Sequence, residues 1–232
     1  MKICGLQKTT LLDFPGHVAA TVFLNGCDFR CPFCHNTELL TGKGNELMSA
    51  EELLDFLKKR RSVLEGVCIT GGEPTLSGAQ LEGLMASVKD LGYLVKLDTN
   101  GYRPEFLKRL CGAGLVDFVA MDIKAGRFHY GEVCGVPGLH MAAIEDSASF
   151  LMEGRIPYEF RTTVVKGLHT AEDFEDIAGW IGGCSQYFLQ GFVDSGNVFK
   201  DGFSAFSRKE MEAFLSIVRT RIPASQIRGV DY

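Results

Sequence analysis

Three cysteines stand close together near the start of the chain, at positions 27, 31 and 34. Their spacing, C-x3-C-x2-C, puts three thiolates on one short segment, where they can converge on an iron–sulfur cluster. Four irons with three protein ligands leave one iron open, and an open iron can bind a substrate or a cofactor. The spacing therefore indicates a 4Fe-4S site, with Cys27, Cys31 and Cys34 as the metal ligands and catalytic residues.

A structural zinc site is the main alternative for these cysteines. Structural zinc takes four protein ligands, often as two C-x2-C pairs, and the sequence lacks a second pair. His35 is a poor fourth ligand because its neighbour Cys34 would have to bind the same metal. The remaining cysteines are scattered, and we expect them to be reduced packing residues. They are Cys4, Cys68, Cys111, Cys134 and Cys184.

The composition is that of an ordinary globular protein. With 232 residues, 46% hydrophobic and 23% charged, the chain is expected to form a single domain over residues 1–232. A net charge of -5 gives no general attraction to nucleic acid or to anionic membranes. We find no apolar signal core at the start and no window as long as a membrane span. A cytoplasmic protein without nucleic-acid or membrane partners is expected.

Short apolar runs alternate with helical patterns along the chain. The runs are nearly continuous and rich in β-branched residues, as in strands buried on both faces of a parallel sheet. They cover residues 18–24, 66–70, 94–98, 118–123, 159–165 and 186–192. Repeated strand–helix units with right-handed crossovers predict an α/β fold with a parallel sheet or an incomplete barrel.

Several helix starts are readable between these strands. Ser49, Ser77 and Ser207 are each followed three residues later by Glu or Gln, which is the capping-box pattern. Thr170 precedes Asp173 at the same spacing, and Pro104 opens a further helical run.

Polar residues collect where the predicted strands end. The runs 71–74 (Gly-Gly-Glu-Pro) and 98–101 (Asp-Thr-Asn-Gly) follow two strands, Asp122 and Lys124 end a third, and Arg161 interrupts a fourth. Each is also typical of a turn, a helix cap or a salt bridge. In parallel α/β folds, however, the chemistry gathers at the carboxyl ends of the strands. Their common placement therefore favours one functional rim that includes the cysteines.

These motifs together resemble the radical S-adenosylmethionine (SAM) superfamily, through the cysteine run with Phe33 and the Gly-Gly-Glu-Pro at 71–74. Further segments resemble activating enzymes of glycyl radical enzymes. They are residues 13–16, 34–36, 98–101 and 121–124, and the likeness runs from about residue 2 to residue 165. Residues 5–16 are most similar to anaerobic ribonucleoside-triphosphate reductase activating proteins.

The resemblance implies a fold, two cofactors and a reaction. The fold is an incomplete (β/α)6 parallel barrel, and the cofactors are a 4Fe-4S cluster and SAM. Reductive cleavage of SAM would give methionine and a 5′-deoxyadenosyl radical, which takes a hydrogen atom from a glycine of a partner enzyme. That glycyl radical enzyme would be anaerobic ribonucleoside-triphosphate reductase, and a flavodoxin or ferredoxin would supply the electron.

The resemblance also implies roles for particular side chains. Gly71, Gly72 and Glu73 would hold the amino group of SAM, and Phe33 would pack on its adenine. A second set would lie beside the methionine part of SAM, where some relatives hold a monovalent cation: Asp98, Thr99, Asp122 and Lys124. Arg161 would bind the carboxylate of SAM or pair with a nearby aspartate. Where relatives carry a histidine near the last strand, this chain has Gln190-Gly191-Phe192.

Three other functions stay open at this point. The chain could activate a formate-lyase type of glycyl radical enzyme, act as a radical SAM enzyme on a small molecule, or be a non-catalytic cysteine–metal module. The sequence has no further cysteine clusters of the kind that support auxiliary iron–sulfur chemistry. That favours a compact enzyme whose open side admits a loop of a large protein partner.

Overall fold

The computed structural model describes residues 1–40, 45–194, 196 and 198–230. The chain divides into two compact units, of which the first is Met1–Asp28 with Glu38–Ala120 and the second is Phe29–Thr37 with Met121–Tyr232. The division therefore falls inside the cysteine segment. A division into compact units does not show whether either unit folds alone. The single domain expected over residues 1–232 therefore stays a prediction.

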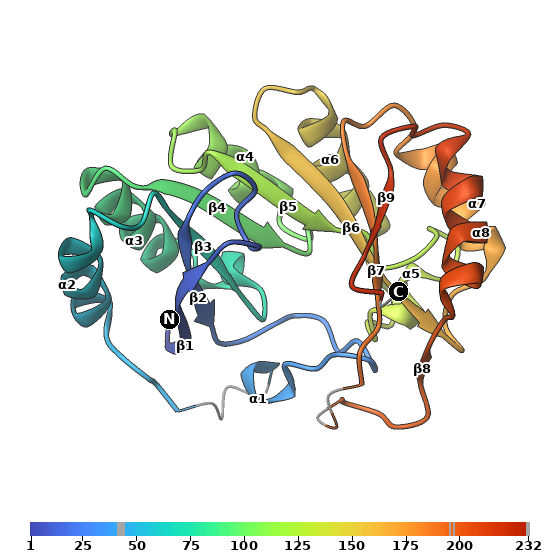
Figure 1. Ribbon diagram of the computed structural model, residues 1–232, viewed down its shortest axis with the longest axis horizontal. Coiled ribbons are helices and arrows are strands. Elements are labelled where there is room, and N and C mark those ends of the chain that lie inside the picture. Colours follow the sequence, from blue (N-terminus) through green and yellow to red (C-terminus); the bar gives the residue numbers. More distant parts are fainter. Residues whose placement is uncertain (41–44, 195, 197, 231–232) are drawn as a thin grey trace. The chain divides into compact units, whose positions relative to one another are not determined.

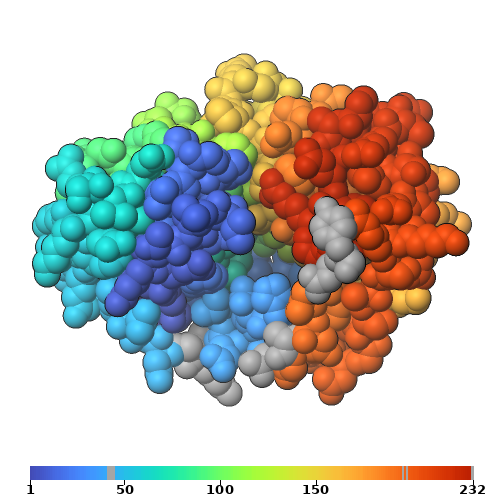
Figure 2. Space-filling view, viewed as in Figure 1, coloured from blue at the N-terminus to red at the C-terminus, as the bar shows by residue number. Residues whose placement is uncertain are grey.

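In the first unit, four strands pair in the order β1-β2-β3-β4 (Figure 1). β1 (Ile3–Thr10) is antiparallel to β2 (Ala19–Leu24), whereas β2, β3 (Gly66–Gly71) and β4 (Leu94–Thr99) run parallel. β2 to β4 are apolar and largely buried, which gives the core of this unit. The first residues of the chain, dark blue in Figure 2, lie at the surface, as the exposed middle of β1 requires.

The helices of the first unit mostly start where the sequence predicts. The Ser49 capping box at the start of α2 (Ala50–Arg60) is present, and Pro104 opens α4 (Pro104–Gly112). The capping box predicted at Ser77 is wrong. Residues Pro74–Ser77 form a short 3-10 turn instead, and α3 (Ala79–Asp90) starts after Gly78 without a side-chain cap. The turn that begins at Pro74 therefore takes the place of the predicted cap.

The second unit repeats the strand–helix pattern. β6 (Tyr158–Lys166), β7 (Tyr187–Gly191) and β9 (Gln226–Arg228) are parallel neighbours, and the two-residue β8 (Ser204–Ala205) pairs with β6. Its helices are α5 (Tyr130–Val133), α6 (Met141–Met152), α7 (Ala171–Trp180) and α8 (Arg208–Arg219), the last at the surface in Figure 2. The two remaining elements, α1 (Thr37–Leu40) and β5 (Phe118–Asp122), contain the points of division.

All of the predicted strand runs are strands in the structure: they correspond to β2, β3, β4, β5, β6 and β7. The predicted capping box at Ser207 starts α8, and α7 starts at Thr170 as predicted, with a capping box to Asp173. β1, β8 and β9 were not predicted. β1 has a polar, exposed middle rather than a continuous apolar run, and the other two are only two and three residues long. In the part of the chain described above, no helix is long and apolar enough to cross a membrane.

Removing the Ser49 cap should destabilise the protein more than removing Ser77. The Ser49 hydroxyl accepts the Glu52 amide at 3.2 Å, and Glu52 in turn accepts the Ser49 amide at 2.7 Å. Ser49→Ala is expected to lower the free energy of unfolding by about 1 kcal/mol. Ser77→Ala, which removes no cap, should stay within about 0.5 kcal/mol of the parent. Urea unfolding measures both, and equal losses would contradict the assignment.

Candidate functional site

The cysteine segment is shared between the two units. Cys27 belongs to the first unit and is half-buried, whereas Cys31 and Cys34 belong to the second, Cys31 being buried. The Cys34 amide donates to the Cys31 carbonyl at 3.0 Å, so these two residues form one turn. Among the described residues, no three Cys, His, Asp or Glu side chains lie together as a metal-binding group, and the ligand set stays a prediction.

Cys31 is buried, whereas Cys27 and Cys34 are half-buried. Burial raises the pKa of its thiol to about 12, although the nearby Lys124 ammonium acts in the opposite direction. A thiol of this kind stays protonated on its own and ionises when a metal cation binds it. Burial acts in the same way on the thiol of Cys184, so the assignment of Cys31 as a ligand rests on the spacing of the motif.

Within the first unit, Asp28 fixes the start of the cysteine segment. The Asn100 side-chain amide donates to Asp28 Oδ1 at 2.9 Å, and Arg103 Nη2 pairs with Asp28 Oδ2 at 3.2 Å. Asn100 stands in the predicted strand-end motif, but neither Asp28 nor Arg103 was singled out from the sequence. The position of Asp28 directly after Cys27 is the signal that could have found it.

Gly71 and Gly72 allow two backbone segments of the first unit to touch. Gly71 has a positive φ of 130°, and a Cβ there would lie 2.2 Å from the Leu24 carbonyl oxygen. A Cβ on Gly72 would lie 2.0 Å from the Gly26 carbonyl oxygen. The end of β3 is therefore pressed against the residues that lead into Cys27, and no side chain fits at either glycine.

Glu73 joins the ends of β3 and β4. Its buried carboxylate accepts four hydrogen bonds, with Oε1 taking the Thr75 amide (3.1 Å), the Thr75 hydroxyl (2.5 Å) and the Thr99 hydroxyl (2.8 Å). Oε2 takes the Asn100 amide at 2.6 Å. Burial raises the pKa of Glu73 to about 6 even though these hydrogen bonds lower it. A carboxylate has about four acceptor positions, so Oε2 is the oxygen with room for a further donor.

Asp98 is paired with a buried lysine, Lys96, that was not predicted from the sequence. Lys96 is 1% exposed, and its ammonium forms an ion pair with Asp98 Oδ1. The Cys68 thiol lies 3.7 Å from the same oxygen. A lysine in a strand is usually exposed, and a buried one needs a charged partner. Asp98 therefore neutralises Lys96, while the neighbouring Thr99 is bonded to Glu73.

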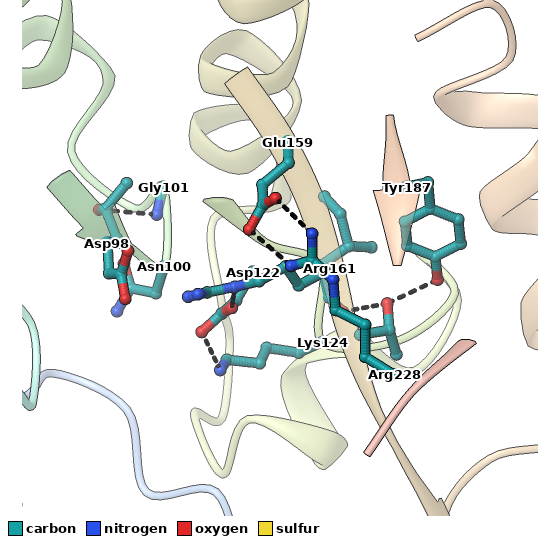
Figure 3. A network of polar contacts seen from close by, with 12 residues as sticks. Asp98, Asn100, Gly101, Asp122, Lys124, Glu159, Arg161, Tyr187 and Arg228 are labelled. Carbon is teal, nitrogen blue, oxygen red and sulfur yellow. Dashed lines mark hydrogen bonds and ion pairs between the residues drawn. The ribbon is translucent and has the colours of Figure 1, made fainter. Parts of the chain in front are cut away.

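Asp122, Lys124 and Arg161 form one ion cluster in the second unit. Figure 3 shows the lysine and the arginine pointing at the two oxygens of the aspartate, at 2.9 Å for Lys124 Nζ and 3.0 Å for Arg161 Nε. Burial would raise the pKa of Asp122, but the two cations outweigh it and hold that pKa far below its usual range. Likewise, burial would lower the pKa of Lys124, and Asp122 raises it. Both cations thus share the one carboxylate of Asp122.

Phe33 is buried within the second unit, at 5% exposure. Its ring meets His169 edge-on, with 6.4 Å between ring centres. His169 Nε2 lies 2.7 Å from the Lys124 carbonyl oxygen, and its Nδ1 accepts the Val165 amide at 3.0 Å. The structure thus assigns Phe33 a packing partner, and its contact with an adenine stays a prediction.

The raised pKa of Glu73 predicts a pH dependence of stability. The folded state favours the protonated carboxyl, so ionising it costs folding free energy between its ordinary pKa of 4.5 and the folded value of about 6. Relative to Glu73→Gln, which cannot titrate, the free energy of unfolding of the parent should fall by about 2 kcal/mol as pH rises through this window. Urea unfolding of the metal-free proteins at several pH values measures the difference. A flat or rising difference would contradict burial as the dominant effect.

Known proteins share both the sequence and the fold of this chain. The family model described as "Radical SAM superfamily" matches residues 21–181. A Methanocaldococcus jannaschii protein named "Putative glycyl-radical enzyme activating enzyme" is 32% identical over 196 residues, which cover 82% of this chain and 79% of that protein. The "Pyruvate formate-lyase-activating enzyme" of Clostridium pasteurianum is 32% identical over 131 residues, 53% of this chain and 52% of that enzyme.

A solved structure shows the likeness in three dimensions. The crystal structure of Streptococcus suis SuiB bound to S-adenosylmethionine matches with a TM-score of 0.68 at 13% identity, over 90% of this chain. This chain spans about half the length of SuiB, since the match covers 52% of it. At that identity the likeness shows the fold alone, and it confirms the predicted fold class, an α/β fold of the radical SAM type.

The predicted resemblance to the radical SAM superfamily and to activating enzymes of glycyl radical enzymes is thus confirmed. The family model covers most of the chain, and the M. jannaschii relative matches over most of its own length. Members of this family use a 4Fe-4S cluster and S-adenosylmethionine, as predicted from the cysteine run and the strand-end motifs. The chain belongs to the radical SAM superfamily, and it is an enzyme of radical redox chemistry.

Proposed function

We propose that this protein is a radical SAM activase that generates a glycyl radical on a partner enzyme, namely anaerobic ribonucleoside-triphosphate reductase. The observation that carries the activase function is the similarity to a protein named as an activating enzyme over 79% of that protein's length. The choice of partner rests on residues 5–16, which resemble the reductase-activating proteins.

Three cysteines would hold the cluster. Cys27, Cys31 and Cys34 would supply the thiolates that hold the cluster, and SAM would bind to it through its amino and carboxylate groups. When bound, these cofactors supply a one-electron cleavage of the S–C5′ bond that yields the radical used on glycine. The C-x3-C-x2-C spacing supports this assignment, because it puts three thiolates on one short segment.

Two groups of residues suit the charged ends of SAM. In the first unit, the segment Gly71–Glu73 brings backbone carbonyls and Glu73 Oε2, which suit an ammonium group. In the second unit, Lys124 and Arg161 bring two cationic groups to Asp122, and cations of this kind suit a carboxylate. The same geometry gives no support to a monovalent cation beside Asp122 or Asp98, because both carboxylates already pair with basic side chains.

The partner and the setting are proposals of the same kind. The similarity to a pyruvate formate-lyase-activating enzyme covers about half of each chain and makes a formate-lyase type of partner the alternative. An anaerobic, cytoplasmic setting with flavodoxin or ferredoxin as electron donor follows from the activase function, because the reaction needs a strong reductant and the product radical reacts with oxygen.

Electron paramagnetic resonance (EPR) of candidate partners tests this function directly. The anaerobically reconstituted protein, SAM and a strong reductant are incubated with an anaerobic ribonucleotide reductase and, separately, with a formate-lyase type enzyme. A glycyl radical doublet on the reductase supports the proposal, and a doublet on the lyase alone reassigns the partner. Formation of 5′-deoxyadenosine without either doublet indicates a small-molecule substrate. A protein that holds zinc and no iron would exclude all radical functions.

Two substitutions should distinguish residues that hold the cluster from residues that bind SAM. Cys31→Ala is expected to lose both the cluster and SAM cleavage. Glu73→Gln should keep its iron and lose at least about tenfold in SAM cleavage, because an amide nitrogen replaces an oxygen that accepts hydrogen bonds from Thr99 or Asn100. Cys111→Ala, a cysteine outside the motif, is the control and should retain iron and activity. Iron analysis and 5′-deoxyadenosine yield measure the outcome, and loss of iron in Glu73→Gln would reject its assigned role.

A further inference from the structure

The short helix α5 ends in a turn that requires a glycine. The Val136 amide donates to the Gly131 carbonyl at 2.8 Å, and the Gly135 amide donates to the Glu132 carbonyl at 3.1 Å. These two bonds are the Schellman pattern, which closes a helix with a left-handed residue. Gly135 is that residue, with a φ of 67°.

The same turn lies against the cysteine segment of the second unit. The Arg30 amide donates to the Cys134 carbonyl at 2.8 Å. Carbonyls at a helix end lack a partner inside the helix, so this one can accept from outside it. A Cβ on Gly135 would lie 2.3 Å from the Arg30 carbonyl oxygen and 2.7 Å from its carbon. The backbone of Gly135 is thus packed directly on the residue before Cys31.

Further contacts hold residues 29–33 in place. The Lys200 amide donates to the Pro32 carbonyl at 2.8 Å, and the side chains of Phe29 and Phe33 are buried. Displacing Arg30 would therefore strain contacts on both sides of Cys31. Backbone groups and buried rings of this kind cannot move aside as easily as the end of a flexible side chain.

The helix is anchored at its other end to the ion cluster. The Tyr130 hydroxyl donates to the Asp122 carbonyl at 3.2 Å, and the Tyr130 ring is buried edge-on against Trp180, with 6.2 Å between ring centres. α5 thus connects the backbone at Asp122 with the backbone before Cys31. Both ends of this connection lie beside residues proposed to hold cofactors.

We propose that Gly135 is a positioning residue for the iron–sulfur cluster. Through the backbone of Arg30 it fixes where Cys31 and Cys34 stand, and neither Gly135 nor Cys134 binds iron. The inference rests on the proposed function only in taking these two cysteines as cluster ligands. Metal sites tolerate only small errors in ligand position, so a displaced Cys31 should weaken the site even when the fold survives.

Gly138 provides a matched control a few residues away. Its φ is 68°, nearly that of Gly135, but nothing lies within 4 Å of a Cβ built there. Gly135→Ala and Gly138→Ala therefore share the strain of a left-handed alanine. Only Gly135→Ala adds the collision with Arg30, for which ordinary contact would need about 3.4 Å.

The full chain and both variants are reconstituted anaerobically with limiting iron and sulfide, and bound iron and sulfide are measured. EPR spectra of the reduced proteins are recorded with and without SAM. Gly135→Ala is expected to retain iron about 10- to 100-fold more weakly, as for substitutions that disturb ligand orientation. Its cluster signal should be altered or lost, whereas Gly138→Ala should match the parent in both measurements.

Equal iron content and identical spectra in the two variants would overturn the proposal. Circular dichroism of the metal-free proteins reports whether each variant folds. If Gly135→Ala does not fold, the pair Gly135→Asn and Gly138→Asn replaces it, because asparagine tolerates left-handed backbone while keeping the Cβ. Failure of both Gly135 variants to fold would also overturn the proposal, since Gly135 would then serve the fold and not the cluster.

The two proposals fail in different ways. A parent protein that binds its cluster and forms no glycyl radical contradicts the activase function and leaves the role of Gly135 standing. Iron-replete Gly135 variants contradict that role and leave the activase function standing.

Discussion

Close approach of backbone to backbone around the cysteine segment is the constraint on which the site depends. In the first unit, Gly71 and Gly72 leave no space for a side chain against residues Leu24 and Gly26, which lead to Cys27. In the second unit, Gly135 leaves none against Arg30, which precedes Cys31. Three thiolates can share one cluster only if the chain that carries them is held still, and backbone contacts are the least flexible way to hold it.

Charge pairing is the second requirement, because the charged groups at the strand ends are largely buried. Glu73 is surrounded by four hydrogen-bond donors, Lys96 is paired with Asp98, and Asp122 is shared by Lys124 and Arg161. Removing the partner of any of these groups would lower the free energy of unfolding by about 3 kcal/mol. In the first unit the pairing leaves acceptor capacity at Glu73 Oε2. In the second unit it holds Lys124 and Arg161 on Asp122.

Much of the fold could be predicted because its signals are local. β2 to β7 are continuous apolar runs, and Ser49, Thr170 and Ser207 cap helices through contacts only three residues long. Ser77 shows the limit of this reasoning. Its spacing to Gln80 fits a capping box, but Ser77 is the last residue of the turn that begins at Pro74, and α3 starts after Gly78. β1 escaped prediction because its exposed middle hides the apolar pattern.

The sequence by itself determined which chemical groups are present and at which strand ends they stand: the cysteine spacing, the Gly-Gly-Glu-Pro run, Asp98, Asp122 and Lys124. Only the tertiary structure decided which partner each group takes. It paired Arg161 with Asp122, buried Lys96 beside Asp98, joined Glu73 to Thr99 and Asn100, and set Gly135 against Arg30. The physical reason is that these contacts connect residues from different strands and loops, whose separation is set by packing and cannot be read from local periodicity.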